Sequence, residues 1–486
     1  MTTDYASLLA GVRTDLWIDG EWRPSHSGER FEVIDPATER EITTVASASP
    51  EDCRAALDAA ERGLEVWSRK TPRERGEVLR KAWELMMREH ERLARIITLE
   101  NGKSLSDARA EVAYAAEFFR WNAEEAVRIF GRISHAPQSG ARIMVHHKAA
   151  GVALLVTPWN FPAAMATRKI GPALAAGCSV LVKPATATPL TMLALMPLLA
   201  QAGVPPGVVN VVPSWRSRQV VAGMLADLRV RVVSFTGSTE VGRALIREAA
   251  NNVVRPCMEL GGNAPFIVLG DADLDAALEG AMIAKMRNMG EACTAANRFY
   301  VHESLVAEFS QKLAERMGAL QAGNGLSEGV SVGPLIDGAA RDRIASLVAD
   351  AVSRGARLLT GGKAPAGPGF FYLPTVLADV PADAAVVREE IFGPVAAIQS
   401  FRTDDEVVRL ANACELGLTA YVYTRDLSRG LQLSERLEVG MVGLNRGLVS
   451  DPAAPFGGVK LSGLGREGGS EGIQEFLETQ YIAVRW

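Results

Sequence analysis

Between Gly151 and Ser238, short apolar runs alternate with segments of helical pattern. The runs VALLV, SVLV, VVNVV and VRVVSF have the length and composition of strands, and residues 167–176 and 189–201 have the length of helices. Strands that alternate with helices are joined by crossover connections, which place the strands in parallel. The pattern therefore predicts a parallel sheet with helices on both faces.

A second series of apolar runs, interleaved with helical segments, follows Leu260. It predicts a second α/β unit, with the boundary near the double glycine Gly261-Gly262. Upstream of both units, residues 50–130 have apolar positions at three-to-four spacing, which predicts a helical region. The runs of the second unit are Phe266–Leu269, Arg298–Val301, Tyr421–Tyr423 and Met441–Asn445.

Two strand-like pieces fit neither unit. One is a polar hairpin over residues 132–147, and the other is the C-terminal segment 478–486. Exposed strands carry unpaired backbone groups that readily pair with another chain. We therefore expect both pieces to join another subunit, in a homodimer or a homotetramer.

Length and charge exclude several classes of protein. A chain of 486 residues is too long for one hydrophobic core, and 48% hydrophobic with 22% charged residues is typical of packed globular proteins. The net charge of −5 comes without a basic stripe, which argues against a nucleic-acid partner. The sequence shows neither a leader pattern nor an apolar stretch of membrane-spanning length, so we expect a cytoplasmic protein without a membrane partner.

The cysteines and histidines do not predict a metal site. The five cysteines lie at wide, irregular spacing with no CxxC, and the six histidines are scattered. This spacing predicts neither a disulfide framework nor a thiolate zinc site, and we expect the thiols to be reduced.

Cys293 lies between a helix end, signalled by Gly290, and a strand predicted to begin at Phe299. A thiolate is a strong nucleophile, and the N–H groups of a turn or helix end stabilise both the thiolate and an oxyanion formed from its target. A cysteine taken alone is more often a small core residue. Its position nevertheless makes Cys293 the candidate nucleophile.

Glu259 stands between Met258 and Leu260, directly before the double glycine. Apolar neighbours on both sides predict a desolvated carboxylate. Desolvation raises the pKa toward the operating pH, which suits a general base that acts on water. The alternative is a surface glutamate, the usual environment of this residue type.

Two turns follow predicted strands of the first unit. Thr157-Pro-Trp-Asn160-Phe-Pro follows VALLV, so Asn160 either donates to an oxyanion at the sheet edge or satisfies a proline-rich turn. Phe235-Thr-Gly237-Ser238 leads into a helix whose N–H groups can face a phosphate, unless Ser238 serves only as a cap. The GxGxxG that starts at Gly463 follows no convincing strand, and we discard it as a phosphate loop.

From about Trp17 to its last residues, the chain resembles the aldehyde dehydrogenase superfamily. The stretches that carry the resemblance are, in chain order, TPWNFP, LVKPATATPL, FTGSTEVG, MELGGNAPFIV, GEACTAANR, EEIFGP and APFGGVKLSGLGREGG. The similarity is strongest to its succinate-semialdehyde dehydrogenases, through PWNFPAAMATRKIGPALAAGC, AKMRNMGEAC and APFGGVKLSGLGRE. The resemblance implies an α/β fold of two Rossmann-like parallel-sheet domains plus a small β oligomerisation element. The implied divisions are a cofactor-binding domain (1–127 and 148–260), a catalytic domain (261–467) and an oligomerisation element (128–147 and 468–486).

The resemblance also implies NAD(P)-dependent oxidation of an aldehyde to a carboxylic acid. Cys293 would form a thiohemiacetal whose oxyanion is held by the Asn160 amide and the Cys293 backbone N–H. Hydride transfer to the nicotinamide would leave a thioester, which water activated by Glu259 would hydrolyse. Glu390 matches the glutamate that contacts the nicotinamide ribose, and Lys183 matches the lysine that holds the adenine ribose. The remaining residues implied for the cofactor groove are Trp159, Asn160, Pro184, Ala185, Thr186, Gly237, Ser238 and Leu260.

Thr186 bears on the choice of cofactor. Family members that prefer NAD often carry a glutamate at this position, which accepts hydrogen bonds from the adenine-ribose hydroxyls and repels a 2′-phosphate. Thr186 removes that repulsion, and Lys183 can pair with the phosphate. We therefore expect NADP to be favoured, with NAD still open.

Arg168 and Arg287 match arginines that bind the far carboxylate in succinate-semialdehyde enzymes, and Ser450 matches a hydrogen-bonding residue of that pocket. A guanidinium suits a forked carboxylate, although each arginine alone fits a structural ion pair equally well. Succinate semialdehyde is thus the predicted substrate, with glutarate semialdehyde or an uncharged aldehyde as the alternative. The sequence departs from related enzymes at two positions. Arg446 stands where relatives often have a small polar residue, and Ala295 replaces a cysteine that some relatives use in a redox switch.

Three other functions fit parts of the sequence. Transfer of the acyl group to coenzyme A would keep Cys293, but family members that do so lack the glutamate at position 259. A cysteine hydrolase would need a Cys/His pair, and no histidine lies in a recognisable motif. An inactive structural homologue is at odds with the presence of Cys293, Glu259 and Asn160.

Overall fold

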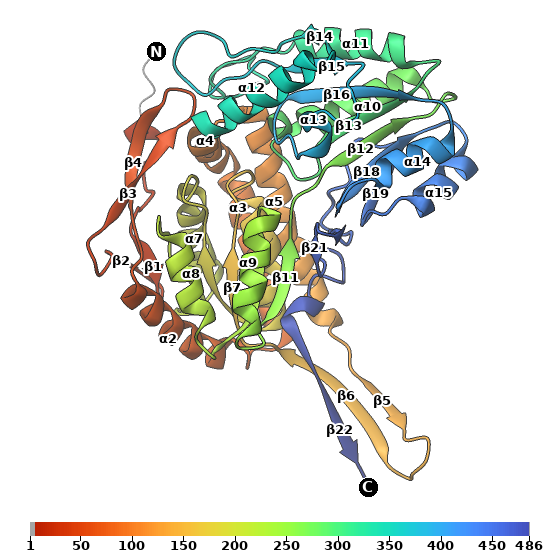
Figure 1. Ribbon diagram of the computed structural model, residues 1–486. Coiled ribbons are helices and arrows are strands. Elements are labelled where there is room, and N and C mark those ends of the chain that lie inside the picture. Colours follow the sequence, from red (N-terminus) through yellow and green to blue (C-terminus); the bar gives the residue numbers. More distant parts are fainter. Residues whose placement is uncertain (1–4, 486) are drawn as a thin grey trace.

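The computed structural model describes residues 5–485, most of which lie in two open sheets and the helices that cover them (Figure 1). The first sheet consists of β1 (Leu16–Ile18), β2 (Glu21–Arg23), β7 (Val152–Val156), β8 (Ser179–Lys183), β9 (Val209–Val211), β10 (Val230–Thr236), β11 (Arg255–Glu259) and β21 (Gly463–Leu464). Its order is β2-β1-β9-β8-β7-β10-β11-β21, and the strands from β9 to β11 run parallel.

Helices cover both faces of this sheet because successive apolar residues of each strand point to opposite sides. Leu155 and Val182 pack with α3 to α7, whereas Leu154 and Leu181 pack with α2, α8 and α9. The predicted parallel sheet with two helical layers is confirmed. The helices are α2 (Pro50–Trp67), α3 (Pro72–Arg88), α4 (His90–Asn101), α5 (Leu105–Glu125), α6 (Ala164–Ala176), α7 (Leu190–Ala202), α8 (Ser217–Leu225) and α9 (Thr239–Ala250).

Helix ends in the N-terminal region follow local sequence signals. Ser49 and Thr71 each form a capping box at the start of α2 and α3, with a proline as the first helical residue. Helix α4 ends at Gly102, whose φ of 92° lies in the left-handed region that glycine tolerates.

The chain enters the second sheet directly after the double glycine. This sheet consists of β12 (Ala264–Val268), β13 (Ala296–His302), β14 (Arg357–Thr360), β15 (Thr375–Ala378), β16 (Val395–Phe401), β18 (Thr419–Tyr423) and β19 (Met441–Leu444). Its order is β14-β15-β16-β13-β12-β18-β19, and all neighbours except β14 and β15 are parallel. Strand β16 lies between β15 and β13, although it was not among the predicted runs.

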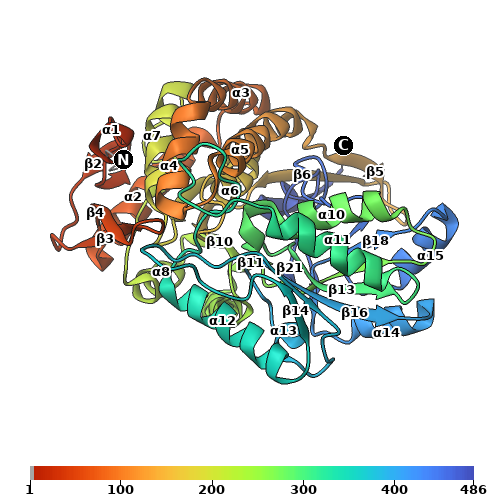
Figure 2. The same cartoon turned by 90° about the horizontal axis from the view of Figure 1, so that it is seen from above.

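Two helical layers also enclose the second sheet (Figure 2). Phe266 and Phe299 face α10 and α11, and Ile267 and Tyr300 face α14 and α15. The helices of this unit are α10 (Leu274–Met286), α11 (Val306–Gly318), α12 (Gly338–Ser353), α13 (Ala385–Arg388), α14 (Asp404–Asn412) and α15 (Leu427–Arg436). None of the helices in the described part of the chain is long and apolar enough to cross a bilayer.

The two strand-like pieces outside these units pair with each other. Strands β5 (Arg132–His135), β6 (Arg142–Ala149) and β22 (Leu477–Val484) form an antiparallel sheet in the order β22-β6-β5. Figure 1 shows this sheet extending from the body of the molecule, with the C-terminus at its far end. Part of the pairing that we expected from another subunit therefore occurs within the chain.

The discarded GxGxxG has a structural function at the edge of the first sheet. Gly463 belongs to β21, which pairs antiparallel with the end of β11, opposite Glu259. Its φ is 141°, and a Cβ there would collide with the carbonyl oxygen of Met258. Although β21 lies within the segment predicted for the catalytic domain, it completes the first sheet.

Candidate active site

The motifs taken from the sequence meet at one edge of the first sheet. Strands β8, β7, β10 and β11 are parallel neighbours, so their carboxyl ends lie side by side. Lys183 ends β8, the turn over residues 157–162 follows β7, Gly237 follows β10, and Glu259 ends β11. The carboxyl ends of parallel strands are where open α/β sheets bind ligands.

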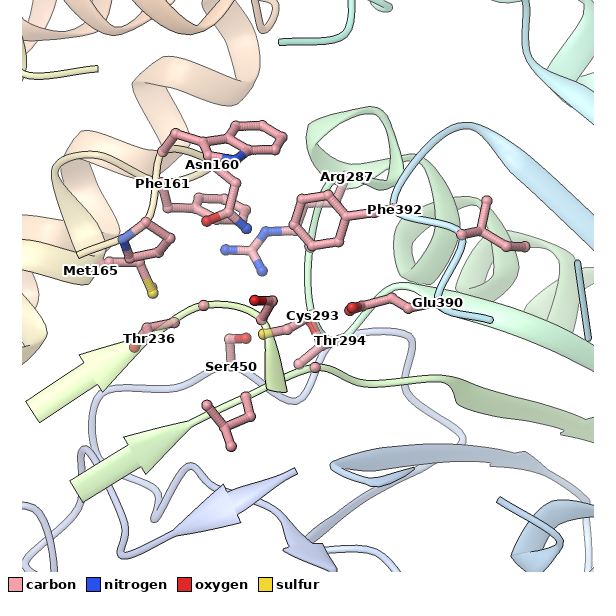
Figure 3. A pocket seen from close by; sticks show the side chains of 18 of the residues that line it. Asn160, Phe161, Met165, Thr236, Arg287, Cys293, Thr294, Glu390, Phe392 and Ser450 are labelled. Carbon is pink, nitrogen blue, oxygen red and sulfur yellow. The ribbon is translucent and has the colours of Figure 1, made fainter. Parts of the chain in front are cut away.

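A cavity of about 310 Å³ opens between this edge and the second sheet (Figure 3). Figure 3 shows the side chains of Asn160, Arg287 and Glu390 around Cys293. Glu259, the sequence neighbour of Leu260, and the segment 183–186 are not among the lining residues. The predicted residues that line the cavity are Trp159, Asn160, Arg168, Gly237, Ser238, Leu260, Arg287, Cys293, Glu390 and Ser450.

Cys293 follows an unusual piece of backbone. After α10, Asn288 and Met289 have φ of 52° and 58°, and Gly290 continues the left-handed conformation with φ of 78°. Such backbone costs free energy in non-glycine residues and persists only where its surroundings hold it. The thiol is half-buried, and β13 begins at Ala296, three residues before the start predicted at Phe299.

The Asn160 amide is tied to the segment that carries Cys293. Its Nδ2 donates to the carbonyl of Glu291 at 3.0 Å, and Asn288 Nδ2 donates to the same carbonyl at 2.9 Å. The Asn160 backbone carbonyl in turn accepts from Asn288 Nδ2 at 3.0 Å. These bonds hold the Asn160 side chain in a fixed position relative to Cys293.

A buried ion pair supports the same turn. Lys103 Nζ donates to the Asn160 carbonyl at 2.7 Å and pairs with Glu111 at 2.6 Å, and both side chains are fully buried. Glu111 also accepts from the backbone N–H of Ala163, the residue before α6, at 2.9 Å. The sequence did not reveal this pair, because its partners stand in an ordinary helical pattern.

We expect Glu111→Gln to lower the free energy of unfolding by about 3–5 kcal/mol, since Lys103 would remain buried without its counter-charge. Thermal and denaturant midpoints measure the effect. Glu91→Gln is the matched control, because Glu91 pairs with Arg109 at 2.8 Å at the surface, where a pair contributes less than about 1 kcal/mol. Equal losses in the two variants would contradict a special contribution of the buried pair.

Glu259 is a buried carboxyl without a hydrogen-bond partner. It is 1% exposed, and neither of its oxygens is hydrogen bonded. Burial raises its pKa well above the usual range, and Glu467 raises it further, whereas Lys169 and Arg168 oppose the shift. The apolar neighbours in the sequence predicted this environment, which suits a group that takes and returns a proton.

A model of the aldehyde dehydrogenase family matches residues 22–482. The chain belongs to the aldehyde dehydrogenase family. It is 55% identical to a succinate-semialdehyde dehydrogenase of Paenarthrobacter nicotinovorans, over 91% of this chain and 98% of the relative. It is 47% identical to a glutarate-semialdehyde dehydrogenase of Pseudomonas putida, over 97% of this chain and 98% of the relative. A crystal structure of an E. coli NADP-dependent enzyme matches with a TM-score of 0.96 and 46% identity over 99% of both chains.

These matches confirm the predicted family, fold class and NAD(P)-dependent aldehyde oxidation. The alternative of a Cys/His hydrolase gains no support, because no histidine lines the cavity among the described residues. Within residues 5–485, no three histidine, cysteine or carboxylate side chains are grouped as metal ligands.

Aromatic side chains complete the cavity of this aldehyde dehydrogenase. Tyr114, Phe161, Phe392 and Phe456 line it together with Met165. They come from separate segments of the chain, so no sequence motif contains them as a set. Their rings make the cavity mostly apolar, and its charged groups are therefore few and specific.

The residues considered for the substrate differ in their environment. Arg287, Ser450 and Arg168 all line the cavity, but Arg287 and Ser450 are half-buried, whereas Arg168 is almost completely buried. Arg446 is exposed and is not among the lining residues. The departure at Arg446 therefore leaves the lining of this aldehyde dehydrogenase's cavity unchanged.

Two groups near the cavity have an unusual electrostatic environment. Burial raises the pKa of Glu390 to about 7, although its Oε1 accepts from the Gly262 N–H at 3.1 Å. Burial lowers the pKa of Lys183 to about 8. The Lys183 ammonium group has no anionic partner in the described part of the chain, and its one hydrogen bond reaches Thr186 Oγ1 at 3.5 Å.

Proposed function

We propose that this aldehyde dehydrogenase oxidises succinate semialdehyde to succinate with NADP. The observation that carries the proposal is Arg287, a half-buried guanidinium that lines the same cavity as Cys293 and has no hydrogen-bond or ion-pair partner among the described residues. A free guanidinium in an apolar cavity is suited to a carboxylate. Ser450 adds a hydroxyl to the same lining.

A second candidate substrate, glutarate semialdehyde, differs from succinate semialdehyde only in chain length. Glutarate semialdehyde carries the same aldehyde and carboxylate, one methylene further apart. The relative from Pseudomonas putida is named for that substrate, and the relative from Paenarthrobacter nicotinovorans for succinate semialdehyde. The higher identity to the latter favours the shorter aldehyde.

In the proposed reaction, the sulfur of Cys293 attacks the aldehyde carbon. The carbonyl oxygen becomes an oxyanion that accepts from the Asn160 amide and from the Cys293 backbone N–H. A nicotinamide bound beside Cys293 would accept the hydride that leaves this carbon. The product on the enzyme is a thioester of Cys293.

Glu259 then acts on water. Its raised pKa allows the carboxylate to take a proton as the water oxygen attacks the thioester carbonyl. The carbon–sulfur bond breaks, Cys293 regains its thiolate, and the carboxylic acid leaves. Because Glu259 supplies hydrolysis, coenzyme A is not needed as an acyl acceptor.

The cofactor fits the edge of the first sheet. Ser238 caps α9 by accepting from the Val241 N–H, and the N–H groups of the first two helical residues stay available to face the pyrophosphate. Lys183 is a buried cation without an anionic partner among the described residues, Thr186 lies beside it, and Ser217 lies beside Thr186, which suits the 2′-phosphate of NADP. We propose that Glu390, which lines the cavity, binds the nicotinamide ribose. The remaining residues that we propose for this groove are Trp159, Asn160, Pro184, Ala185, Gly237 and Leu260.

The β22-β6-β5 sheet is the proposed contact between subunits. Phe130, Ile133 and Tyr481 on and beside it are 73%, 64% and 60% exposed, and β5 and β22 leave unpaired edges. Pairing with a second copy would cover both features, in a homodimer or a homotetramer. We also propose the division of the chain that the sequence predicted, into cofactor-binding, catalytic and oligomerisation segments.

Steady-state kinetics test the substrate and the cofactor together. The formation of reduced nicotinamide is followed with succinate semialdehyde, glutarate semialdehyde and butanal, each with NADP and with NAD. We expect kcat/KM to be at least about tenfold higher for succinate semialdehyde than for butanal, because one charge-assisted contact contributes that much, and higher with NADP than with NAD. Equal or faster oxidation of butanal would contradict the proposed substrate.

A further inference from the structure

Glu291 is a fully buried carboxyl group two residues before Cys293, and the proposed reaction does not use it. The residue is 0% exposed. Its Oε1 accepts from the backbone N–H of Ile336 at 3.2 Å, whereas its Oε2 has no hydrogen-bond partner. Within residues 5–485, no cation forms an ion pair with this carboxyl. Glu291 is therefore a buried acid without a counter-charge.

The charged groups that face Glu291 do not replace that counter-charge. They are Lys103 and Asp337. Lys103 is already paired with Glu111 at 2.6 Å, and Asp337, which caps α12, is itself an acid. Burial raises the pKa of Glu291 well above its usual range; the Ile336 N–H and Lys103 oppose this shift, and Asp337 adds to it. A carboxyl in such surroundings keeps its proton, because an ion without a partner is costly to bury.

The backbone of Glu291 makes contacts that the proposed reaction needs. Its carbonyl oxygen accepts from Asn160 Nδ2 at 3.0 Å and from Asn288 Nδ2 at 2.9 Å. An amide nitrogen carries two N–H groups, so that of Asn160 gives one to this carbonyl and keeps the second for an oxyanion. The position of the oxyanion donor therefore depends on where the Glu291 carbonyl lies.

The side chain of Glu291 helps to fix that carbonyl. Its bond to Ile336 ties the segment to the chain that leads into α12, and the segment includes Asn288 and Met289, whose left-handed φ persists only where contacts hold it. A protonated carboxyl suits this place, since one oxygen accepts and the other carries the proton. An ionised carboxylate would draw in water or leave the interior, and the carbonyl of the same residue would move with it.

We propose that Glu291 is a positioning residue that holds the Asn160 amide in place only while its own carboxyl is protonated, so that its ionisation sets an alkaline limit on aldehyde oxidation. The inference rests on the proposed function, in which the Asn160 amide stabilises the oxyanion. Ionisation releases one proton to solvent and breaks no other bond. The folded chain retains this proton at a pH where the unfolded chain releases it. The stability of the wild type should therefore fall as the pH rises from the ordinary carboxyl pKa to the raised one.

Thermal unfolding of Glu291→Gln tests the protonation state without turnover. The amide has nearly the shape of a protonated carboxyl, and it does not ionise. We expect the difference between the midpoints of the variant and the wild type to increase in favour of the variant from weakly acidic to alkaline pH. Glu248→Gln, an exposed change on α9, is the matched control and should show a difference that is independent of pH.

The pH profile of kcat/KM for the aldehyde tests the positioning. This constant includes the steps through hydride transfer, so hydrolysis by Glu259 does not enter it. Dividing the variant by the wild type cancels the ionisation of Cys293. We expect the ratio for Glu291→Gln to rise by up to about tenfold per pH unit in the alkaline range, because one pKa unit corresponds to a factor of ten. The ratio for Glu248→Gln should stay constant.

Either of two results would overturn the inference. A difference in midpoints that does not change with pH would show that Glu291 is ionised in the folded wild type. A constant ratio of kcat/KM would show that the ionisation does not reach Asn160. Glu291→Met, which is also neutral, enters the same comparisons if Glu291→Gln does not fold. The proposed function fails differently: if the wild type prefers butanal, the carboxylated substrate is wrong, but the ratios measured with butanal still decide the role of Glu291.

Discussion

Cys293→Ala is expected to abolish aldehyde oxidation, with kcat reduced by at least about 10⁴-fold. The reason is that no other lining side chain of the cavity is a comparable nucleophile, so the thiohemiacetal cannot form. The measurement is the formation of reduced nicotinamide with succinate semialdehyde at saturating cofactor. Because alanine fills less space at a half-buried position, the fold and the binding of cofactor should persist.

Cys414→Ala is the matched control. Cys414 is also half-buried, but it lies outside the lining of the cavity that contains Cys293. This variant should keep wild-type kcat. Substantial turnover by Cys293→Ala, or a similar loss in both variants, would show that the reaction does not depend on a thioester of Cys293.

Glu259→Gln is expected to separate the two halves of the reaction. Rapid mixing should show about one equivalent of reduced cofactor per site, followed by a steady state about 10²- to 10⁴-fold slower than in the wild type. The amide keeps the shape of the side chain but cannot take a proton from water. The thioester therefore accumulates, and its mass on the Cys293 peptide is the second measurement.

The pH dependence provides a further check on Glu259. Burial raises its pKa, so the carboxyl is protonated over a wider range and gains its basic form only as the pH rises. The wild-type steady-state rate should therefore increase toward alkaline pH, and this increase should be absent from deacylation in Glu259→Gln. Glu248→Gln, an exposed change on α9, is the control and should leave both rates unaltered. Normal turnover by Glu259→Gln would remove the proposed base.

The elements that the sequence predicted well are those whose pattern is local. Strands β7 and β8 contain unbroken apolar runs, VALLV and VLV, and their short connections to helices determine that the strands lie in parallel. Strand β16 was missed, since Gln399 and Ser400 interrupt its apolar run even though it lies inside the second sheet. Burial in a sheet depends on neighbouring strands, which a local pattern does not contain.

The sequence by itself determined the order of the motifs, the family, the candidate nucleophile and the raised pKa expected for Glu259, because each is encoded in a few consecutive residues. Only the tertiary structure decided which charged and polar side chains contact one another. It brought Lys103 to Asn160, put Glu467 between Arg168 and Lys169, and left Arg287 free. These contacts join segments up to 298 residues apart, and whether a charge is paired or free in a low-dielectric interior depends on groups that only folding brings together.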